Sequence, residues 1–465
     1  MKECLAKQKS AFLKHPYPSK QERIAHLQDL KQALLDNEQA ICDAISADFG
    51  HRSPSETRFV ELMSCVGDIN YTIGKIGKWM KPERRGVGLQ FMPASNKIMY
   101  QPLGVIGIIV PWNYPLYLSI APLTAALAAG NRAMIKMSEF TPNFNKVLIK
   151  LIEEIFKPNL VKIVEGEADV AAQFSALPFD HILFTGSTAV GKHVMRAAAE
   201  NLTPVTLELG GKSPAIIDDK INIKTAAKQI LFGKCVNSGQ TCVAPDYVLC
   251  PKDKVEQLTQ ALSEQFNKFY PDFDQNSDYT HVVNDRQYDR IQSWLDEAAN
   301  ANANIISTTD KPYTDYKDGR RKLPLQMVLD ADESLNVMQQ EIFGPVMPII
   351  PYNNLDEAIS YVQERPRPLA LYIHSFSKRT QEHILTHTHA GGVTINDTVL
   401  HFGQKDMPVG GVGPSGMGMY HGVEGFKTFS SAKGIHAKGK INSVEFIHPP
   451  YEKSLLKLVL KLFMR

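Results

Sequence analysis

The chain has 465 residues, of which 43% are hydrophobic and 22% are charged, and its formal net charge is +2. This composition is ordinary for a globular protein, and the length predicts two or three domains. The near-neutral charge argues against nucleic acid as the main partner. We expect neither a secretory signal in residues 1–10 nor a membrane-spanning helix, which would need an apolar run of about 18 residues.

The six cysteines show neither a CxxC pair nor the spacing of a zinc site, so no metal centre is predicted. Free thiols are typical of a reducing compartment, and the sequence therefore favours the cytoplasm. The cysteines are Cys4, Cys42, Cys65, Cys235, Cys242 and Cys250.

Helical periodicity dominates near the N-terminus. Apolar residues such as Leu27, Leu30 and Leu34 recur at helical spacing, which predicts helices over residues 19–80. Residues 81–88 are rich in proline, glycine and charge, as is typical of a connector. Residues 89–100 are expected to form a pair of short strands.

Strands and helices then alternate regularly. Residues 105–110 form a continuous apolar run, as in a strand buried on both faces. A helix ending at Gly130 follows, and after a strand at 133–137 Thr141 is the expected N-cap of the next helix. The alternation predicts a parallel, doubly wound α/β sheet, which binds ligands at the carboxyl ends of its strands. Its further strands are predicted at 160–164, 181–185 and 205–209.

A second α/β pattern begins near Ser213 and continues to about Asp397. Residues 401–425 are dense in glycine and are expected to be rich in loops. The predicted strands of the second pattern are residues 247–250, 347–351, 369–374 and 392–396.

The strongest chemical signal is a thiol and a carboxylate. Cys242 ends Ser-Gly-Gln-Thr-Cys, and Glu208 begins Glu-Leu-Gly-Gly-Lys. A thiol can attack a carbonyl and hold the product as a thioester, and a carboxylate can activate the water that releases it. Each residue alone has a simpler interpretation, a small buried hydrophobe for the cysteine and a loop carboxylate for the glutamate.

Other polar residues also follow predicted strands. Asn113 comes after the first buried strand and could donate to a developing oxyanion, although such an asparagine is more often a helix cap. Lys136 and Glu139 come after the second strand and could hold a ribose or a phosphate, or form a solvated charge pair. Glu341 stands near Phe343 in a tight turn that on its own indicates no function.

Two glycine signatures suggest phosphate binding. Residues 186–192 read GxxxxGK, but His193 replaces the Ser or Thr of a P-loop, so we predict only a helix start that offers backbone amides to a pyrophosphate. Residues 411–416 read GxGxxG, without a following βαβ unit. They are better interpreted as a glycine-rich turn near the active site.

The order of these motifs resembles the aldehyde dehydrogenase superfamily over residues 101–429. The motifs are the asparagine after the first strand, Lys-x-x-Glu, Phe-Thr-Gly-Ser, Glu-Leu-Gly-Gly-Lys, Gly-Gln-Thr-Cys and Glu-Ile-Phe-Gly-Pro. Residues 242–247 and 416–422 resemble the class 3 branch, which includes fatty, aromatic and coniferyl aldehyde dehydrogenases. The segment that starts at Gly425 is most similar to the coniferyl aldehyde dehydrogenase group.

The resemblance implies a role for each motif residue. Cys242 would attack the aldehyde, Asn113 would stabilise the oxyanion, hydride would pass to NAD(P), and Glu208 would activate water to hydrolyse the thioester. Lys136 and Glu139 would hold the adenosine ribose, which favours NAD, with NADP as a second option. The remaining cofactor contacts implied are Gly186, Ser187, Thr188, Ala189, Val190 and Gly191 at the pyrophosphate, Glu341 at the nicotinamide ribose and Phe343 nearby.

The resemblance also implies an aldehyde dehydrogenase-like fold. A Rossmann-type NAD(P)-binding domain would comprise residues 1–81 and 100–207, with 401–429 returning to it. The α/β catalytic domain would comprise residues 208–400. A small β bridging region at 82–99 and 430–450 would support a homodimer. The expected substrate is an aromatic, coniferyl-type aldehyde or an apolar aldehyde of medium or long chain, and its pocket is expected near Tyr117, His401 and Phe402.

The C-terminal tail, residues 451–465, combines a basic stripe with an apolar body. Lys453, Lys457, Lys461 and Arg465 recur every four residues among leucines. Such a helix could lie on an anionic membrane as a peripheral contact. Docking on its own subunit or on a dimer mate is the interpretation that we favour at this level.

Two other functions deserve comparison. A cysteine thioesterase or esterase without redox chemistry would use the same thiol, but it leaves the nucleotide motifs without a purpose. A non-catalytic nucleotide-binding protein would have no need for Cys242, Glu208 and Asn113 together.

Overall fold

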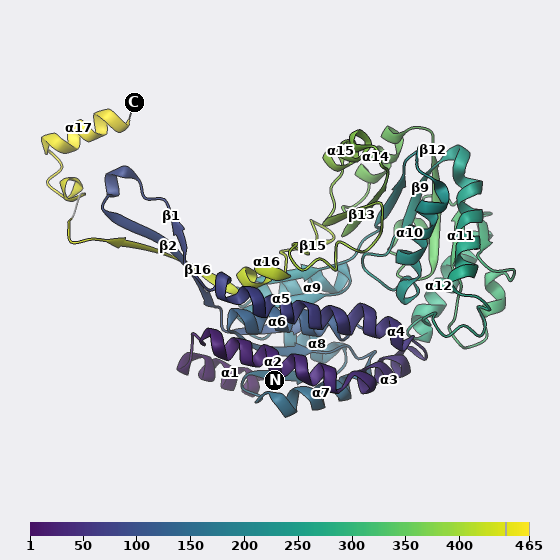
Figure 1. The fold of residues 1–465 in the computed structure, drawn as a ribbon, viewed down its shortest axis with the longest axis horizontal. Helices are drawn as coiled ribbons and strands as arrows, with labels where there is room; N and C mark the ends of the chain where they lie inside the picture. Colours follow the sequence, from purple (N-terminus) through teal and green to yellow (C-terminus); the bar gives the residue numbers. More distant parts are fainter. Residues whose placement is uncertain (442–443, 465) are drawn as a thin grey trace.

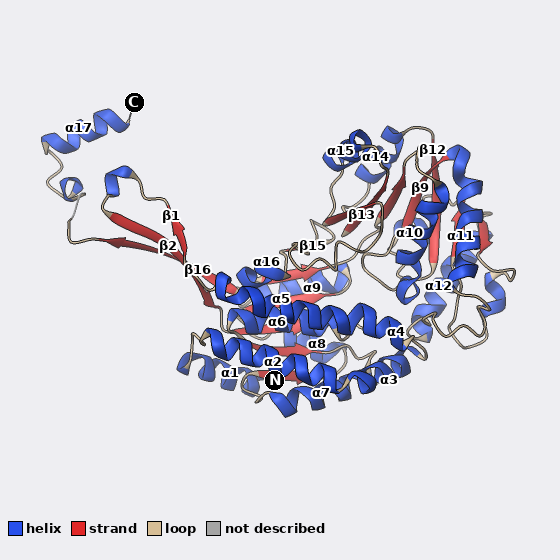
Figure 2. Cartoon of the chain, in the orientation of Figure 1, coloured by secondary structure: helices blue, strands red, loops and turns tan. Residues whose placement is uncertain are grey.

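The computed structural model contains three β-sheets and describes residues 1–441 and 444–464. A six-stranded and a seven-stranded sheet form two α/β bodies (Figures 1 and 2). The third sheet has three strands and projects from these bodies as an arm (Figure 1). Among the described residues, no helix is both long enough and apolar enough to cross a bilayer.

The N-terminal helices pack mainly on the six-stranded body. Apolar residues at helical spacing, including Leu27, Leu30 and Leu34, are fully buried, which confirms the periodicity in the sequence. Ser19 and Glu22 form a capping box at the start of α2. A helix before residue 19, α1, was missed by sequence reasoning. The helices are α1 (Lys2–Lys14), α2 (Lys20–Asp36), α3 (Glu38–Phe49), α4 (Pro54–Glu56), a π-helical turn (Thr57–Leu62) and α5 (Met63–Trp79).

The prediction for residues 81–100 was wrong in detail. The expected connector contains a strand, β1 (Glu83–Arg85), and the expected pair of strands is one 3₁₀ turn (Leu89–Phe91) and one strand, β2 (Ala94–Pro102). Both strands belong to the arm, where β2 pairs antiparallel with β1 and with β16 (Ser430–Lys438). Tertiary pairing with a distant segment decided this structure, because the local sequence is polar and lacks strong alternation.

The six-stranded sheet has the strand order β15-β7-β6-β3-β4-β5. All its pairs are parallel except that of β15, so the predicted doubly wound sheet is confirmed. The order reverses between β3 and β6, and ligands of such sheets bind beyond the carboxyl ends of the strands at this point. The strands are β3 (Val105–Ile109), β4 (Arg132–Lys136), β5 (Val161–Val164), β6 (His181–Thr185), β7 (Val205–Glu208) and β15 (Gly416–Met417).

The helices of this body include one that is buried all round. Every residue of α6 is buried, and Gly130 ends the helix in the left-handed conformation that a glycine allows. Thr141 precedes α7 as expected, but its side chain caps nothing. Its hydroxyl donates instead to Ser138 and Asn145. The helices are α6 (Tyr117–Ala129), α7 (Pro142–Ile155), α8 (Ala168–Ser175), α9 (Thr188–Ala199) and α16 (Gly422–Thr428).

The seven-stranded sheet has the order β10-β11-β12-β9-β8-β13-β14 and is parallel except at β10. The four predicted strands are present as β9, β12, β13 and β14. Three short strands, β8, β10 and β11, were missed. The strands are β8 (Pro214–Ile217), β9 (Tyr247–Pro251), β10 (Asn304–Ser307), β11 (Gln326–Leu329), β12 (Val346–Tyr352), β13 (Ala370–His374) and β14 (Gly392–Ile395).

Helices cover this second sheet as well. Their apolar residues join the buried residues of the sheet in a second core, which is separate from the core of the first body. The helices are α10 (Ile223–Cys235), α11 (Val255–Phe269), α12 (Asp285–Asn300), α13 (Asn336–Gln339), α14 (Leu355–Gln363) and α15 (Lys378–His387).

The tail forms the helix α17 (Ser454–Phe463) beyond the tip of the arm (Figure 1). None of its residues is buried, and Leu455, Leu458 and Leu462 are all exposed. Docking on its own subunit is therefore not found in the part of the tail that is described. Of the predicted basic stripe, Arg465 lies outside the described residues.

Candidate active site

The loop that carries Cys242 has an unusual backbone. After α10 ends at Cys235, Asn237, Ser238 and Gly239 have φ values of 51°, 55° and 74°, in the left-handed region. A Cβ atom on Gly239 would lie 2.5 Å from the carbonyl oxygen of Gly344, so only glycine fits this close approach. Three consecutive left-handed residues turn the chain sharply just before the thiol, and the surrounding contacts must maintain this costly conformation.

Cys242 is accessible although its neighbours are not. It is partly exposed, whereas Thr241 and Val243 are buried. Desolvation, followed by the negative charges of Glu341 and Glu208, raises the pKa of the thiol to about 12. Cys242 is therefore a protonated thiol at neutral pH, and Glu341 and Glu208 lie close enough to influence its pKa.

Glu208 ends β7 and is 4% exposed. Neither carboxylate oxygen has a hydrogen-bond partner among the described residues, and burial raises the pKa of this carboxyl well above its ordinary value. A buried polar group without partners is costly and calls for a functional explanation. Gly416, in the glycine-rich turn, pairs with Glu208 across the sheet edge, so the prediction that residues 411–416 form a turn near this site is confirmed.

Asn113 brings the first sheet to the thiol loop. It follows β3, is 2% exposed, and its side-chain amide donates to the carbonyl of Gln240 at 3.1 Å. Its neighbour Tyr114 makes a hydroxyl–hydroxyl hydrogen bond of 2.7 Å with Thr241. An amide donor from one body thus lies against the loop of the other body that carries the candidate nucleophile, Cys242.

Glu341 and Phe343 occupy the loop before β12. The carboxylate of Glu341 lies against the Gly210 backbone, where an added Cβ would be 2.1 Å from its Oε2. Burial, followed by the charge of Asp246, raises the pKa of Glu341 to about 8. Phe343 packs edge-on against Trp112, with ring centroids 5.3 Å apart. The structure therefore brings this motif to the same site as the residues that follow β3 and β7.

Lys136 and Glu139 lie at the carboxyl end of β4. Lys136 is 2% exposed, donates to the carbonyl of Met137 at 2.7 Å, and lies 4.0 Å from a carboxylate oxygen of Glu139. Burial lowers the pKa of Lys136, which the carboxylates of Glu139 and its neighbours partly oppose. This pair does not contact Cys242 directly. It lies at the ligand-binding edge of the same sheet.

The glycine-containing segment after β6 opens α9, as predicted. The amide of Gly186 donates to the carbonyl of Glu208 at 3.0 Å, and Ser187 caps the helix through the amide of Val190. A Cβ atom would lie 2.6 Å from the Phe184 ring at Gly186, and 2.7 Å from Leu209 at Gly191. The absence of side chains at these two positions allows the helix to start close against the strands. Ser187, Ala189 and Val190 are exposed and Thr188 is partly exposed.

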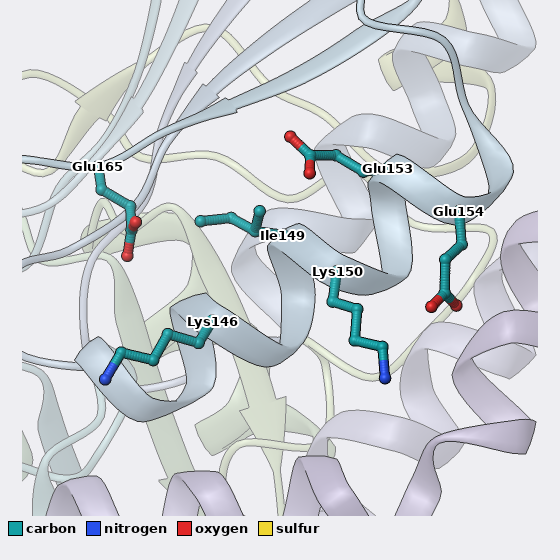
Figure 3. Close-up of a pocket in the computed structure, with 6 residues that line it drawn as sticks. All are labelled: Lys146, Ile149, Lys150, Glu153, Glu154 and Glu165. Carbon is teal, nitrogen blue, oxygen red and sulfur yellow. The ribbon is translucent and has the colours of Figure 1, made fainter.

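A cavity of about 460 Å³ lies along α7 (Figure 3). Ile149 provides its apolar surface and points toward Glu165, which follows β5 (Figure 3). Glu165 also influences the pKa of Lys136, so the cavity adjoins the edge of the sheet where Lys136 lies. None of the candidate catalytic residues lines it. Its other lining residues are Lys146, Lys150, Glu153 and Glu154.

Aromatic side chains gather near the candidate catalytic residues Cys242 and Glu208. Tyr117 and Phe402, which the sequence placed near the substrate pocket, meet with ring centroids 6.1 Å apart, and His421 contacts both. Sequence reasoning missed Tyr420, whose buried hydroxyl has no partner among the described residues. The charges of Glu208 and Cys242 both affect its pKa, which burial raises well above the ordinary value. Tyr420 lies within residues 416–422, which resemble the class 3 branch. This resemblance was the one signal in the sequence that could have pointed to Tyr420.

Sequence reasoning also missed the polar side chains that support the thiol loop. Asn237 donates to the carbonyls of Asn113 and Gln240, and Gln240 donates to those of Asn237 and His281. Arg52 and Glu61 are fully buried beneath the loop that carries Asn113. The one signal in the sequence is their position, since Gln240 lies within the thiol motif and Asn237 directly precedes it.

Comparisons with known proteins agree with this geometry. The profile of the aldehyde dehydrogenase family matches residues 1–435. The chain is 53% identical over 461 residues to the "Probable coniferyl aldehyde dehydrogenase" of Pseudomonas aeruginosa, which covers 99% of this chain and 95% of that protein. The structure resembles substrate-bound AldH of Staphylococcus aureus, with a TM-score of 0.94, 36% identity and coverage of 100% and 99%. It also resembles an aldehyde dehydrogenase of Mycobacterium tuberculosis complexed with NAD⁺, with a TM-score of 0.83, 27% identity and coverage of 93% and 88%.

Proposed function

This chain belongs to the aldehyde dehydrogenase family, and from that premise we propose that it oxidises aromatic, coniferyl-type aldehydes to the carboxylic acids with NAD⁺. Its activity as an NAD(P)-dependent aldehyde dehydrogenase follows from the family and its named relatives. The observation that carries the proposal is the meeting of Cys242, Glu208 and Asn113 from separate segments. The aromatic side chains of Tyr117, Phe402 and His421 support a planar, apolar substrate.

Acylation begins at Cys242. The thiol gives its proton to solvent water and the sulfur attacks the aldehyde carbon, which forms a thiohemiacetal whose oxygen carries the developing negative charge. The Asn113 amide, once released from the Gln240 carbonyl, can donate to this oxygen together with the Cys242 backbone amide. NAD⁺, when bound, supplies the acceptor for the two electrons and the hydrogen that the carbon loses as the thioester forms.

Deacylation requires Glu208. As a carboxylate it removes a proton from water, and the resulting hydroxide attacks the thioester carbon and releases the acid and the Cys242 thiolate. Because burial raises the pKa of Glu208, this carboxyl can hold the proton and pass it on after each turnover. The absence of hydrogen-bond partners for its oxygens leaves them free to bind that water.

The residues at the sheet edge fit a dinucleotide. The α9 N-terminus lies close against Phe184 and Leu209 because Gly186 and Gly191 lack side chains, which leaves its backbone amides open to a pyrophosphate. Lys136 and Glu139 would hold the adenosine ribose, and Glu341 the nicotinamide ribose with Phe343 beside it. The Glu139 carboxylate would repel a 2′-phosphate, which supports NAD over NADP.

The assay that tests this function follows NADH absorbance with NAD⁺ and a panel of aldehydes. Coniferyl-type aldehydes should give the highest kcat/KM, whereas preference for medium- or long-chain alkyl aldehydes would contradict the substrate assignment. A cysteine thioesterase would hydrolyse thioesters and form no NADH. Nothing specific in the structure favours that alternative, because it leaves the sheet-edge residues without a role.

We also propose a homodimer and a cytoplasmic location. The arm of β1, β2 and β16 is exposed along most of β16, and β16 is an edge strand whose unpaired backbone groups can pair with another chain. A second copy of this chain is the simplest partner. All six cysteines are free, which supports a reducing compartment.

The tail helix α17 supports a peripheral contact with an anionic membrane. Most of its apolar residues are exposed, and Lys453, Lys457 and Lys461 fall within one face of the helix. Docking on a dimer mate would bury the leucines, but it gives no role to the lysines.

A further inference from the structure

Three charged side chains are buried at the boundary between the two α/β bodies. Arg52 and Glu61 have fully buried side chains, and the side chain of Glu56 is 12% exposed. They come from the segment between α3 and α5, outside every motif that indicated function. Burying charges is costly, and hydrophobic replacements of such pairs are often as stable, so their presence calls for another explanation.

Arg52 connects the two carboxylates to the loop that carries Asn113. Its Nη1 lies 2.8 Å from Glu61 Oε1 and donates to the backbone carbonyl of Asn113 at 3.3 Å. Its Nε lies 3.5 Å from Glu56 Oε1, and its guanidinium stacks on the Tyr114 ring at 4.9 Å. Burial opposes the charge of Arg52, but Glu61 and Glu56 outweigh this effect, and the pKa of the guanidinium is raised.

Glu61 fixes the far end of the same loop. Its Oε2 accepts hydrogen bonds from the amides of Leu116 and Tyr117 at 2.8 and 2.9 Å. These amides begin α6, which has no side-chain cap of its own. Glu61 therefore acts as the missing cap, where a negative charge is also favoured by the helix dipole. The loop between β3 and α6 is thus held on both sides of Asn113.

Glu56 fixes the thiol loop. Its Oε1 accepts from the amide of Asn237 at 2.8 Å, and its Oε2 from the Thr280 hydroxyl at 3.3 Å. Asn237 is the first of the three left-handed residues before Cys242, and its side chain donates to the Asn113 carbonyl at 3.0 Å. Arg52 and Asn237 therefore converge on one carbonyl oxygen from opposite bodies.

We propose that Arg52, through Glu56 and Glu61, positions the Asn113 amide against the Cys242 loop and so sets the geometry of acylation. The three are positioning residues, because none of the contacts described is with the thiol itself. The inference rests on the proposed roles of Asn113 and Cys242. Among the residues that the structure describes, Arg52 alone touches both carboxylates and the Asn113 backbone, so its loss should loosen both loops at once.

The test compares substitutions at Arg52 with matched substitutions at Arg23. Arg23 is 1% exposed and its guanidinium donates to the carbonyls of Pro18 and Ala128, away from the thiol loop. R52M should lower kcat/KM for the aldehyde by about 10²-fold, as expected for misplaced reacting groups. R52K should recover part of this loss, and KM for NAD⁺ should stay near wild type. R23M should leave kcat per folded molecule unchanged.

A second measurement needs no aldehyde. The rate of Cys242 alkylation by iodoacetamide, followed by mass spectrometry across a pH series, should change in R52M and in E56Q but not in R23M. If wild type oxidised no aldehyde while this difference persisted, the proposed function would fail and the positioning role would stand. Equal alkylation profiles in all variants, with activity lost only in proportion to unfolding, would show a purely structural role for Arg52 and overturn the inference. The unfolding midpoint of each variant shows whether its loss of activity follows its loss of stability. E56Q keeps an oxygen acceptor for Asn237 and therefore provides a milder change should R52M fail to fold.

Discussion

The carboxylate of Glu341 occupies the space that a side chain at Gly210 would need. An added Cβ on Gly210 would lie 2.1 Å from Oε2 and 2.4 Å from Oε1 of Glu341. The φ angle of Gly210 is not in the left-handed region, so the glycine is required by space and not by backbone conformation. The motif that contains Glu208, the candidate for activating water, is therefore in direct contact with the motif that contains Glu341, the candidate for binding ribose.

Substituting Gly210 tests this contact. G210A should push the Glu341 carboxylate out of its position and lower kcat/KM by at least about tenfold, with a higher KM for NAD⁺. In an E341S background, where the space is free, the same substitution should have little further effect. Steady-state kinetics of the four proteins check this, with G74A, at a site with open space, as control. Additive effects of G210A and E341S would contradict a direct contact.

The thiol of Cys242 should respond to the two carboxylates. Its pKa is raised to about 12, so the reactive thiolate is scarce at neutral pH and its fraction grows about tenfold per pH unit toward that value. E341Q and E208Q each remove a carboxyl group that becomes negatively charged as the pH rises. Each substitution should therefore lower the thiol pKa and speed alkylation at alkaline pH, above about 8 for Glu341. Alkylation rates across a pH series provide the measurement, with buried Cys235 as the internal control. Slower alkylation in both variants would be inconsistent with these contacts.

Glu208 should control the second half of the reaction and its pH dependence. E208Q should preserve a first burst of NADH and lower the steady-state rate by about 10²-fold or more. Because the pKa of Glu208 is raised, the carboxyl is protonated at acidic pH and the carboxylate appears only as pH rises. Deacylation in wild type should therefore accelerate with pH, and E208Q should lose that dependence. Loss of the burst together with turnover would place Glu208 in acylation.

The tail helix should bind anionic membranes. Full-length protein should float with phosphatidylserine vesicles and not with phosphatidylcholine vesicles, and a chain ending at Tyr451 should float with neither. The variant K453E/K457E/K461E keeps the apolar residues and should also fail to float. Equal flotation of the full-length and shortened chains would rule out this contact, and a change in oligomeric state on shortening would indicate docking on a dimer mate.

Much of the fold could be predicted from the sequence because its signals are local. The apolar run at 105–110 and the alternation after it specify buried parallel strands, and residues after such strands collect at one sheet edge. The failures have one local cause and one long-range cause. β8, β10 and β11 have only four residues each, too few for a clear period. In residues 81–100, pairing with β16, far along the chain, decided which segments became strands.

The order and spacing of the motifs determined, by themselves, the family, the reaction class and the candidate residues at the site. Only the tertiary structure decided how those residues are held. The hydrogen bond from Asn113 to Gln240 joins positions 127 residues apart, and the one from Glu56 to Asn237 joins positions 181 apart. The raised pKa of Glu208 likewise comes from burial, and that of Cys242 from burial and from the charges of Glu341 and Glu208, which are distant in the sequence. A linear pattern specifies which side chains are present, but desolvation and polar contacts depend on what surrounds each side chain after folding.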